Sequence, residues 1–300
     1  MERLLSLRDA HPYLRLFRGR TFVIKLSGAV LASAAARDAL CEDIALLHHV
    51  GIRLALVHGG GPQLDAACAT MGIPREVVAG RRVTDARTLE LARMIFRGQL
   101  NSELVGALAA HGVKAVGLSG GDGMSVTGIR RPARTVRDPS TGAEQSVDFG
   151  HVGDITAVDE TLPRLLLDAG IVPVYCSLIA DAAGNLLNTN ADTIASRLAI
   201  AVKAEKLIVC TSVPGLLEDR DDPRRLVSFG DLGTVEELIR QGVVSGGMLP
   251  KLAAVKDALL GGVPRVHLID GTREQALLLE VFTNEGCGTM LVARQSDEPA

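Results

Sequence analysis

The stretch Arg53-Leu-Ala-Leu-Val-His-Gly-Gly-Gly-Pro-Gln63 decides how this chain folds. Its apolar half, 54–57, has the length of a buried strand and runs directly into three glycines at 59–61. A helical pattern follows from Leu64 and ends near Gly72. A strand that passes through bare glycines into a helix gathers backbone N–H groups at the positive end of the helix dipole. One or two glycines are enough for a tight turn, so the triplet favours a cradle for an oxyanion or a phosphate.

The same alternation of apolar strands and amphipathic helices is repeated along the chain. We expect strands at 21–28, 113–118, 171–176, 206–210 and 265–269. We expect helices at 34–49, 86–111 and 162–169, a further helix that begins near Asp192, and a last one that follows Lys251 and ends at Leu260. This order predicts an α/β fold with a doubly wound, mostly parallel central sheet and helices on both faces. Ligands of such sheets bind beyond the carboxyl ends of the strands. There we expect the glycine triplet to meet Ser27, Gly28 and the loop 120–123.

Two segments depart from this alternation. Residues 124–158 show no helical period and carry turn residues at 138–142, so we expect β-hairpins inserted on the α/β frame. Residues 1–18 predict a helix that Pro12 breaks or kinks. The large apolar side chains of this segment are Leu4, Leu5, Leu7, Tyr13, Leu14, Leu16 and Phe17. A leading helix this apolar packs either on its own domain or on a neighbouring subunit.

The composition argues against several classes of protein. The 300 residues are 47% hydrophobic, which is enough for one large α/β domain or for two lobes. A net charge of −3 without any basic block argues against nucleic acid as a partner. No apolar run reaches the roughly 18 residues of a membrane span, and the charged N-terminus is unlike a signal peptide. The five scattered cysteines predict buried, reduced thiols in the cytoplasm. The seven histidines lack the spacing of a metal site, so we expect no metal held by the protein alone.

Three charged residues are candidates for the chemistry. Lys25 lies within an apolar strand, where an unpaired ammonium group is costly, so we expect it to end in a polar cleft that faces an anion. Lys251 follows two glycines and a proline at a predicted helix start, and is either a surface lysine or one that faces a ligand. Asp192 is either the N-cap of its helix or a carboxylate that holds two lysines in place. The sequence alone leaves both pairs of alternatives open.

Motifs spread over the chain resemble those of the acetylglutamate kinases, which belong to the amino acid kinase family. The resemblance extends from about residue 10 to residue 292 and keeps the motifs in order. They are Phe22-Val-Ile-Lys25 with Gly28, His58-Gly-Gly-Gly-Pro-Gln63, Arg82-Val-Thr-Asp85, Gly120-Gly-Asp-Gly123, Gly150-His-Val-Gly153, Asn188-Thr-Asn-Ala-Asp192, Ala204-Glu-Lys-Leu207, Gly246-Gly-Met-Leu-Pro-Lys251, His267-Leu-Ile-Asp-Gly271, Leu278-Leu-Glu-Val-Phe-Thr283 and Gly286-Cys-Gly-Thr-Met290.

The resemblance implies an enzyme that moves the γ-phosphoryl group of ATP to the side-chain carboxylate of N-acetyl-L-glutamate, the second step of arginine synthesis. It implies an oligomerisation helix at 1–20, a lobe for the amino acid at 21–178 and a lobe for the nucleotide at 179–300, joined by one continuous sheet. A carboxylate is already deprotonated at neutral pH, so no general base is needed. The difficulty is to bring two anions together, because unit charges 4 Å apart repel by about 4 kcal/mol at an effective dielectric constant near 20.

The resemblance also implies roles for individual residues. Lys25 and Lys251 would stabilise the transition state, and Asp192 would orient them. The implied contacts of the amino-acid substrate are Gly60, Gly61, Arg82 and Asn188. The implied contacts of the nucleotide are Gly28, Gly60, Ser212 and Gly215, with Mg²⁺ carried by the nucleotide.

The first residues are similar to the N-terminal helix of the arginine-inhibited members, which are hexamers built as trimers of dimers. The implied contacts of the inhibitor arginine here are Tyr13, Lys206, His267, Glu280 and Gly286. Several positions differ from the family pattern: Ser27 replaces a glycine, Ser212 replaces an aspartate, and Gly271-Thr272 and Gln275 replace an arginine and a histidine near the regulatory end. One alternative is therefore a catalytically weak, arginine-sensing subunit that partners a separate N-acetylglutamate synthase acetyltransferase. Another is a kinase for an aminoadipate analogue, because one methylene contributes only about 1–3 kcal/mol of discrimination.

Overall fold

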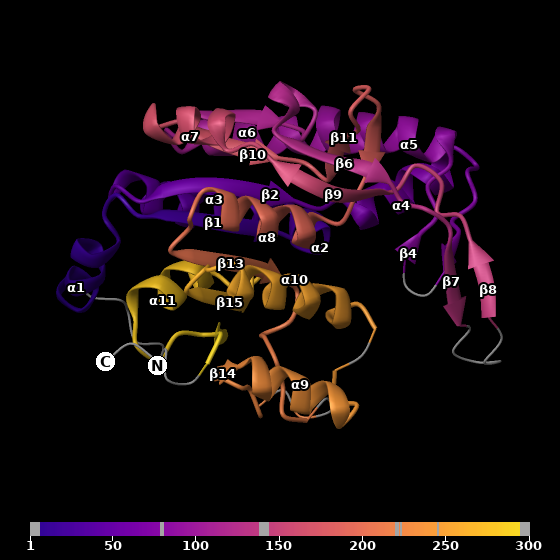
Figure 1. Cartoon of the computed structure of the whole chain (residues 1–300). Coiled ribbons are helices and arrows are strands. Elements are labelled where there is room, and N and C mark those ends of the chain that lie inside the picture. Colours follow the sequence, from indigo (N-terminus) through magenta and orange to yellow (C-terminus); the bar gives the residue numbers. More distant parts are fainter. Residues whose placement is uncertain are drawn as a thin grey trace.

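An eight-stranded sheet forms the centre of the computed structural model, which describes residues 7–78, 81–137, 144–219, 222, 224–244 and 246–294 (Figure 1). Its strand order is β14-β16-β15-β13-β1-β2-β10-β5, and among these described strands only β15 and β16 pair antiparallel. The strands are β1 Thr21–Leu26, β2 Arg53–His58, β5 Ala115–Leu118, β10 Val172–Tyr175, β13 Lys206–Thr211, β14 Phe229–Asp231, β15 Arg265–Asp270 and β16 Thr289–Val292.

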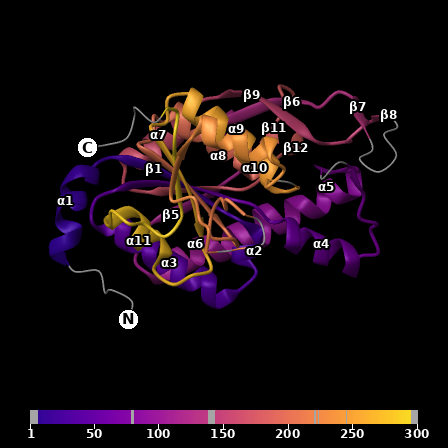
Figure 2. The ribbon, with the colours of Figure 1, turned by 90° about the horizontal axis from the view of Figure 1, so that it is seen from below.

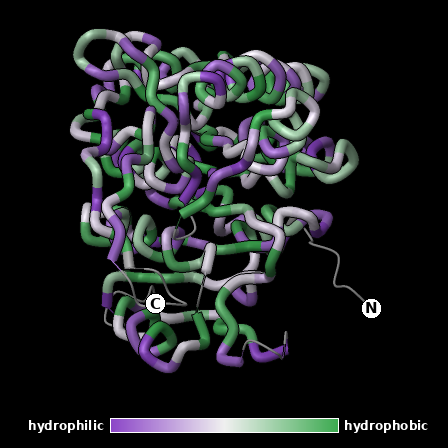
Figure 3. Tube along the Cα trace, turned by 90° about the vertical axis from the view of Figure 1, so that its right-hand side faces the viewer, coloured by the Kyte–Doolittle hydropathy of each residue, from purple (hydrophilic) through white to green (hydrophobic). Residues whose placement is uncertain are grey.

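Helices cover both faces of this sheet, as Figure 2 shows from below. One face packs on α7 Thr161–Asp168, α8 Ala191–Ala201 and α10 Met248–Leu260, and the other on α3 Ala34–His49, α6 Asn101–Ala110 and α11 Ala276–Phe282. Successive side chains of a strand point to opposite faces. In β1 the buried Val23 therefore joins the first apolar cluster, whereas Phe22 and Ile24 join the second. Figure 3 shows the alternation of hydrophobic and hydrophilic stretches along the chain that produces these layers.

The remaining elements surround the carboxyl ends of the central strands or extend the edges of the fold. A second sheet has the order β12-β11-β6-β9, and two small hairpins pair β3 with β4 and β7 with β8. Their bounds are β3 Val77–Val78, β4 Arg81–Arg82, β6 Val126–Arg130, β7 Arg134–Arg137, β8 Glu144–Val147, β9 Gly153–Val158, β11 Leu178–Ala180 and β12 Leu186–Asn188. The remaining helices are α1 Leu7–Phe17, α2 Gly28–Leu31, α4 Gly61–Thr70, α5 Ala86–Ala92, a π-helix Arg93–Leu100, a 3₁₀ turn Asp122–Met124 and α9 Leu232–Arg240.

The fold class predicted from the sequence is confirmed. Helix α3 has the expected bounds, and the long helical stretch at 86–111 is present as α5, the π-helix and α6. The pairs β6 with β9 and β7 with β8 are the expected hairpins, although the turn at 138–142 lies outside the described residues. Of the two effects expected of Pro12, the break is wrong, because α1 continues through it, and the kink stays a prediction. Residues 1–6 lie outside the described part.

Two further expectations concern the interior and the surface. Four of the five cysteines are buried, and Cys287 is half-buried. Among the described helices none is long and apolar enough to cross a membrane.

Candidate active site

The bend between β2 and α4 leaves no room for a side chain at Gly60, whereas a Cβ on Gly59 would make ordinary contacts and one on Gly61 would meet nothing within 4 Å. A Cβ on Gly60 would lie 2.6 Å from Leu100 Cδ1 and 2.7 Å from the ring of Phe96. A Cβ on Gly28, the first residue of α2, would lie 2.9 Å from Pro62 Cδ and 3.0 Å from Gly60 Cα. The two loops therefore pack backbone against backbone, and only glycine fits at either point.

A cavity of about 390 Å³ opens beside this bend. Six of the residues singled out in the sequence line it: Lys25, Gly28, Gly60, Gly61, Arg82 and Asn188. They come from the carboxyl ends of β1 and β2, from β4 and from the end of β12, which places the cavity at the sheet edge where ligands of parallel sheets bind. The expected meeting of the first two glycine loops is thus confirmed.

Asp192 joins the two candidate lysines. Its Oδ1 lies 2.8 Å from Lys25 Nζ, and its Oδ2 lies 3.4 Å from Lys251 Nζ. The exposed fractions of the side chains are only 6% for Lys25, 10% for Asp192 and 12% for Lys251. We call these three residues the Lys–Asp–Lys cluster. With one carboxylate between two ammonium groups, the cluster keeps one positive charge that no member of it balances.

The pKa values in the cluster follow from burial and from these charges. Burial alone would raise the pKa of Asp192, but Lys25 and Lys251 together lower it below its ordinary value. Burial and then repulsion from Lys25 lower the pKa of Lys251, against the attraction of Asp192. The cluster therefore favours an added anion, which would relieve the repulsion between the two ammonium groups.

The structure also decides between the alternatives left open for Asp192 and Lys251. Asn190 is the N-cap of α8, because its side chain accepts a hydrogen bond from the Asp192 N–H at 2.7 Å. The Asp192 carboxylate is thus the group that holds the lysines. Lys251 lies in the first turn of α10 and points inward instead of into solvent.

Arginines form another part of the cavity wall. Arg81, Arg82 and Arg131 all line it. Arg82 is paired with Asp65, and Arg131 lies 2.6 Å from Asp154 Oδ1. Burial, and then repulsion from Arg131, lower the pKa of Arg81. Sequence analysis missed Arg81 and Arg131, although the Arg81-Arg82 pair in a hairpin was a usable signal for the first.

Asn188 supplies a neutral polar group to the same cavity. It ends β12, and its Nδ2 donates to Thr84 Oγ1 at 3.1 Å. The amide is therefore fixed by Thr84, and it lines the same cavity as Arg82. A carboxylate and an amide of one ligand would both find partners here.

Several of the expected contributors lie outside this cavity. Asp192 and Lys251 do not line it themselves, although Lys25, which contacts Asp192, does. The loop 120–123 follows β5, which is two strands beyond β2 in the sheet, and none of its residues lines the cavity. Its expected meeting with the other glycine loops is therefore wrong. Ser212 and Gly215 follow β13, at the same sheet edge as Lys25, but neither lines the cavity. Ser27 is the N-cap of α2 and accepts a hydrogen bond from the Val30 N–H at 3.3 Å.

A second cavity, of about 820 Å³, lies between α1, α11 and the β13–β15 pair. All five residues singled out for arginine line it: Tyr13, Lys206, His267, Glu280 and Gly286. Tyr13 OH donates to Asn284 Oδ1 and so links α1 to the segment after α11. A Cβ on Gly286, where φ is +60°, would lie 2.7 Å from Glu280 Oε2.

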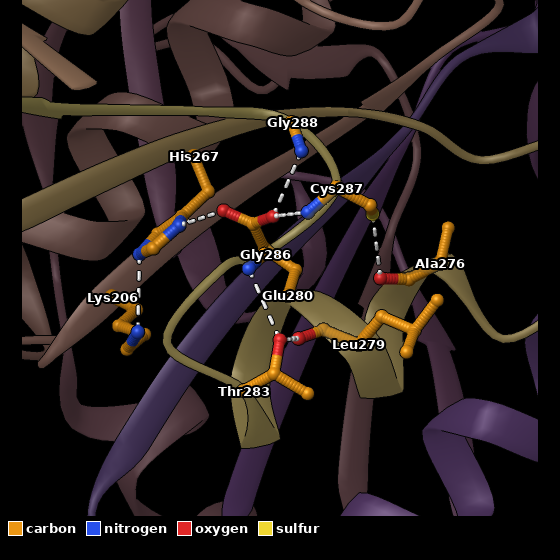
Figure 4. A network of polar contacts seen from close by, with 9 residues as sticks. All are labelled: Lys206, His267, Ala276, Leu279, Glu280, Thr283, Gly286, Cys287 and Gly288. Carbon is orange, nitrogen blue, oxygen red and sulfur yellow. Dashed lines mark hydrogen bonds and ion pairs between the residues drawn. The ribbon is translucent and has the colours of Figure 1, made fainter. Parts of the chain in front are cut away.

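A line of hydrogen bonds connects three of these residues, as Figure 4 shows. Lys206 Nζ lies 3.1 Å from His267 Nε2, and His267 Nδ1 lies 2.6 Å from Glu280 Oε1. We call them the Lys–His–Glu relay. Glu280 Oε2 also accepts from the N–H groups of Cys287 and Gly288, at 2.8 and 3.0 Å.

Charges in the relay are set by burial and by these bonds. Burial, and then Lys206, lower the pKa of His267 to about 4, so its ring is neutral at pH 7. Burial would raise the pKa of Glu280, but its bond with His267 and the backbone N–H groups lower it to about 2. Burial lowers the pKa of Lys206 to about 8. At neutral pH the relay is therefore one cation and one anion bridged by a neutral imidazole.

The described residues contain no group of three His, Cys, Asp or Glu side chains arranged to hold a metal ion. The Lys–Asp–Lys cluster is cationic and is not a set of metal ligands. What the main cavity offers is positive charge and backbone N–H groups for an anion, beside a carboxylate-and-amide site. Such a cavity suits the transfer of a phosphoryl group to an acidic molecule.

The sequence model of the amino acid kinase family matches residues 20–270. This chain belongs to the amino acid kinase family. An acetylglutamate kinase of Myxococcus xanthus (strain DK1622) is 46% identical to it over 295 residues, which are 98% of this chain and 96% of that enzyme. The resemblance to the acetylglutamate kinases of this family, which the motifs indicated, is thus confirmed.

Two solved structures of N-acetylglutamate synthase from Neisseria gonorrhoeae have a similar fold. The complex with coenzyme A and N-acetyl-glutamate has a TM-score of 0.80 at 28% identity. The complex with coenzyme A and L-arginine has a TM-score of 0.78 at 27% identity. Each match covers 96% of this chain, which spans 62% and 64% of the two synthase chains.

Proposed function

We propose that this protein is an acetylglutamate kinase, which uses ATP to phosphorylate the side-chain carboxylate of N-acetyl-L-glutamate and forms N-acetyl-L-glutamyl 5-phosphate in arginine biosynthesis. The observation that carries the proposal is the Lys–Asp–Lys cluster beside a glycine bend without side chains. The 46% identity to an acetylglutamate kinase supports it over nearly the whole chain.

The reaction requires positive charge and not a base. The nucleophile is a carboxylate, which is deprotonated at neutral pH. Each pair of unit charges that it forms with a phosphate at 4 Å costs about 4 kcal/mol at an effective dielectric constant near 20. Lys25 and Lys251 would offset this repulsion and stabilise the charge on the equatorial oxygens of the transferred group. Because Asp192 holds both ammonium groups in place, little reorganisation would be needed during transfer.

The acidic substrate would lie against Arg82 and Asn188. The planar guanidinium of Arg82 fits a carboxylate with two parallel hydrogen bonds, and the Asn188 amide suits the acetyl group. The N–H groups of Gly60 and Gly61 would bind on the phosphate side. A kinase for an aminoadipate analogue stays an alternative, because the same groups would serve a chain longer by one methylene.

The nucleotide would approach from the α10 side, with Gly28 and Gly60 near its terminal phosphate and Ser212 and Gly215 farther along. Mg²⁺ would be held by the phosphates of the nucleotide. In this arrangement residues 21–178 form the amino-acid lobe and 179–300 the nucleotide lobe. The shared sheet, in which β13 pairs with β1, would keep the two lobes in register.

A second proposal concerns the cavity with the Lys–His–Glu relay, which we assign to arginine as a feedback inhibitor. Its cation and its anion, Lys206 and Glu280, suit the opposite charges of an amino acid with a guanidinium group. The exposed Leu16 on α1, with 55% of its surface accessible, supports the proposal that α1 joins dimers into a hexamer, a trimer of dimers. We place the enzyme in the cytoplasm, where its unpaired cysteines would stay reduced.

The test is the formation of acyl phosphate, trapped with hydroxylamine, from ATP and N-acetylglutamate by the purified chain. We expect hydroxamate that requires both substrates and Mg²⁺, and that decreases when arginine is added. No product at saturating substrates would instead favour the arginine-sensing subunit without catalysis. Faster reaction with an acetylated aminoadipate would favour that alternative.

A further inference from the structure

A chain of polar groups lies next to the glycine bend, and none of its side chains (His58, Arg97 and Asn101) lines the cavity. Arg97 Nη1 lies 3.3 Å from Asn101 Oδ1. Asn101 Nδ2 lies 2.9 Å from the Val174 carbonyl and 3.1 Å from His58 Nε2. His58 Nδ1 in turn lies 3.1 Å from the carbonyl oxygen of Gly59.

These bonds fix the tautomer of His58. A carbonyl oxygen can only accept, so Nδ1 carries the proton and donates to Gly59. The unprotonated Nε2 then accepts from the Asn101 amide, whose second hydrogen is donated to Val174. Burial lowers the pKa of His58 to about 4, so the ring is neutral at pH 7. Every polar atom of the two side chains has a partner.

The surrounding structure is shaped to admit this pair. His58 is 0% exposed and Asn101 is 1% exposed. A Cβ on Gly117 of β5 would overlap the Asn101 side-chain oxygen, so glycine leaves the space for it. Apolar residues of the same shape would fill the interior without needing any of these bonds. Packing alone therefore does not explain the polar pair.

The π-helix brings the same segment onto the bend. The Asn101 N–H donates to the Phe96 carbonyl, five residues earlier, where an α-helix would use the residue four earlier. As a result Phe96 and Leu100 press on Gly60 while Asn101 reaches His58. One helical segment thus controls both the position of the bend and the groups behind it.

The consequence for the cavity lies in the peptide between Gly59 and Gly60. No peptide bond in the described residues is cis, so the N–H of Gly60 points opposite to the carbonyl of Gly59. That carbonyl faces the His58 ring, and Gly60 lines the cavity. Within the described residues no carbonyl or side chain accepts from the Gly60 N–H. The Gly59 N–H, by contrast, is occupied by the Leu26 carbonyl at 2.9 Å.

We propose that His58 and Asn101 are positioning residues for phosphoryl transfer: they hold the Gly59–Gly60 peptide so that the Gly60 N–H points at the transferred group. This inference rests on the proposed function. Neither side chain lines the cavity, and both act through one backbone donor.

The test compares kcat and KM in the hydroxylamine assay for four variants. His58→Leu and Asn101→Leu should each lower kcat roughly 10- to 100-fold, somewhat less than the loss of a whole oxyanion donor, with both KM values changed less than about threefold. The double variant should lose no more activity than the less active of the two single variants, because both changes break the same path. His58→Asn, whose amide can replace Nδ1–H, should recover to within roughly fivefold of the wild type.

The control is Leu104→Ala, which removes a fully buried side chain one turn along α6 from Asn101. When Leu104→Ala is compared with Asn101→Leu under conditions where both have lost the same thermal stability, Leu104→Ala should keep kcat within about twofold of the wild-type value. If Leu104→Ala lowers kcat as much as Asn101→Leu, or if the two single losses multiply in the double variant, the inference is overturned.

A second readout does not depend on activity. In ¹⁵N spectra of the unliganded protein, His58 should show a protonated Nδ1 and a hydrogen-bonded Nε2, and Asn101→Leu should shift only the Nε2 signal strongly. A ring protonated at Nε2 would overturn the inference even in an active enzyme. Absence of hydroxamate from the wild type would instead contradict the proposed function, and the spectra would still test the arrangement.

Discussion

Two buried clusters of charged residues lie at opposite ends of the central strands, and they differ in the charge they keep. The Lys–Asp–Lys cluster lies at the carboxyl end of β1 and keeps one positive charge. The Lys–His–Glu relay starts at Lys206, the first residue of β13, and its charges balance. Both bury a lysine near an acid, so the kinds of residue alone do not distinguish them.

The difference shows what each cavity can accept. A buried charge without a partner is costly, so the first cluster gains most from an anion that arrives with its ligand. In the relay, the neutral ring of His267 separates a cation from an anion, and each can still meet the opposite charge of one zwitterion. The carboxyl ends of the strands are where the ligands of parallel sheets usually bind. The relay shows that this fold can build a second charged cavity elsewhere, between α1 and the segment after α11.

The largest effect is expected for Asp192→Ala, which leaves two buried ammonium groups facing each other. Breaking such a buried pair costs about 3–5 kcal/mol of unfolding free energy, and millimolar inorganic phosphate should restore part of it. Urea unfolding with and without phosphate measures both quantities. Asp168→Ala, which breaks the exposed pair with Arg53, is the control and should cost less than about 1 kcal/mol. If Asp192→Ala and Asp168→Ala lost the same unfolding free energy, the claim that Asp192 balances one of two buried positive charges would be contradicted.

A smaller effect is expected from acid, through His267 in the relay. Its pKa is about 4 in the folded protein against an ordinary 6.5. Between these values the unfolded chain binds a proton that the folded chain does not, so stability is lost as pH falls through this window. The gap corresponds to at most roughly 3 kcal/mol.

The measurement for His267 is a difference between two proteins, because another group opposes it. Burial raises the pKa of Asp43 to about 7. Because its carboxyl group binds a proton more readily in the folded protein, it adds to the unfolding free energy as pH falls over the same range. Urea unfolding of the wild type and of His267→Gln, at steps from pH 7 to 4, separates the two contributions. The wild type should lose more stability than His267→Gln on acidification. Parallel curves would show that His267 is not held neutral.

The smallest effect is expected for Glu280→Gln on arginine binding. Charge-assisted hydrogen bonds are about twice as strong as neutral ones, so removing the anion should weaken arginine binding roughly tenfold in calorimetry. Glu285→Gln alters a carboxylate in the wall of the same cavity and should change the affinity less than about threefold. An unchanged affinity of Glu280→Gln for arginine would show that arginine does not bind at the Lys–His–Glu relay.

The parts of the fold that the sequence predicts are those with a local cause. The period of apolar residues predicts α3 and the central strands, and the glycine triplet predicts the bend, because these patterns act over a few residues. Lys25 was identifiable because a lysine inside an apolar strand needs a partner. The partner itself, Asp192, is fixed by the packing of α8 on β1. From the sequence alone, this residue could equally have been the N-cap of its helix.

Other features depend on contacts between distant segments. The loop 120–123 has the glycines of a ligand loop, yet the position of β5 at the sheet edge removes it from the cavity. Arg131 lines the cavity because β6, which it follows, pairs with the distant strand β9, whose Asp154 holds its guanidinium group. The π-helix has no local signal that distinguishes it from the α-helices on either side, and its effect is a shift of register by one residue.

The central claim is that the positive charge kept by the Lys–Asp–Lys cluster stabilises the transferred group, and kcat of Lys251→Ala tests it most directly. Lys256→Ala is the matched control, since Lys256 lies on the same helix and pairs with the exposed Glu236 at 2.8 Å. In the hydroxylamine assay at saturating substrates, Lys251→Ala should lower kcat roughly 10²- to 10³-fold, as for the loss of one oxyanion donor, and Lys256→Ala should leave it unchanged. A folded Lys251→Ala protein with the kcat of the wild type would contradict the account.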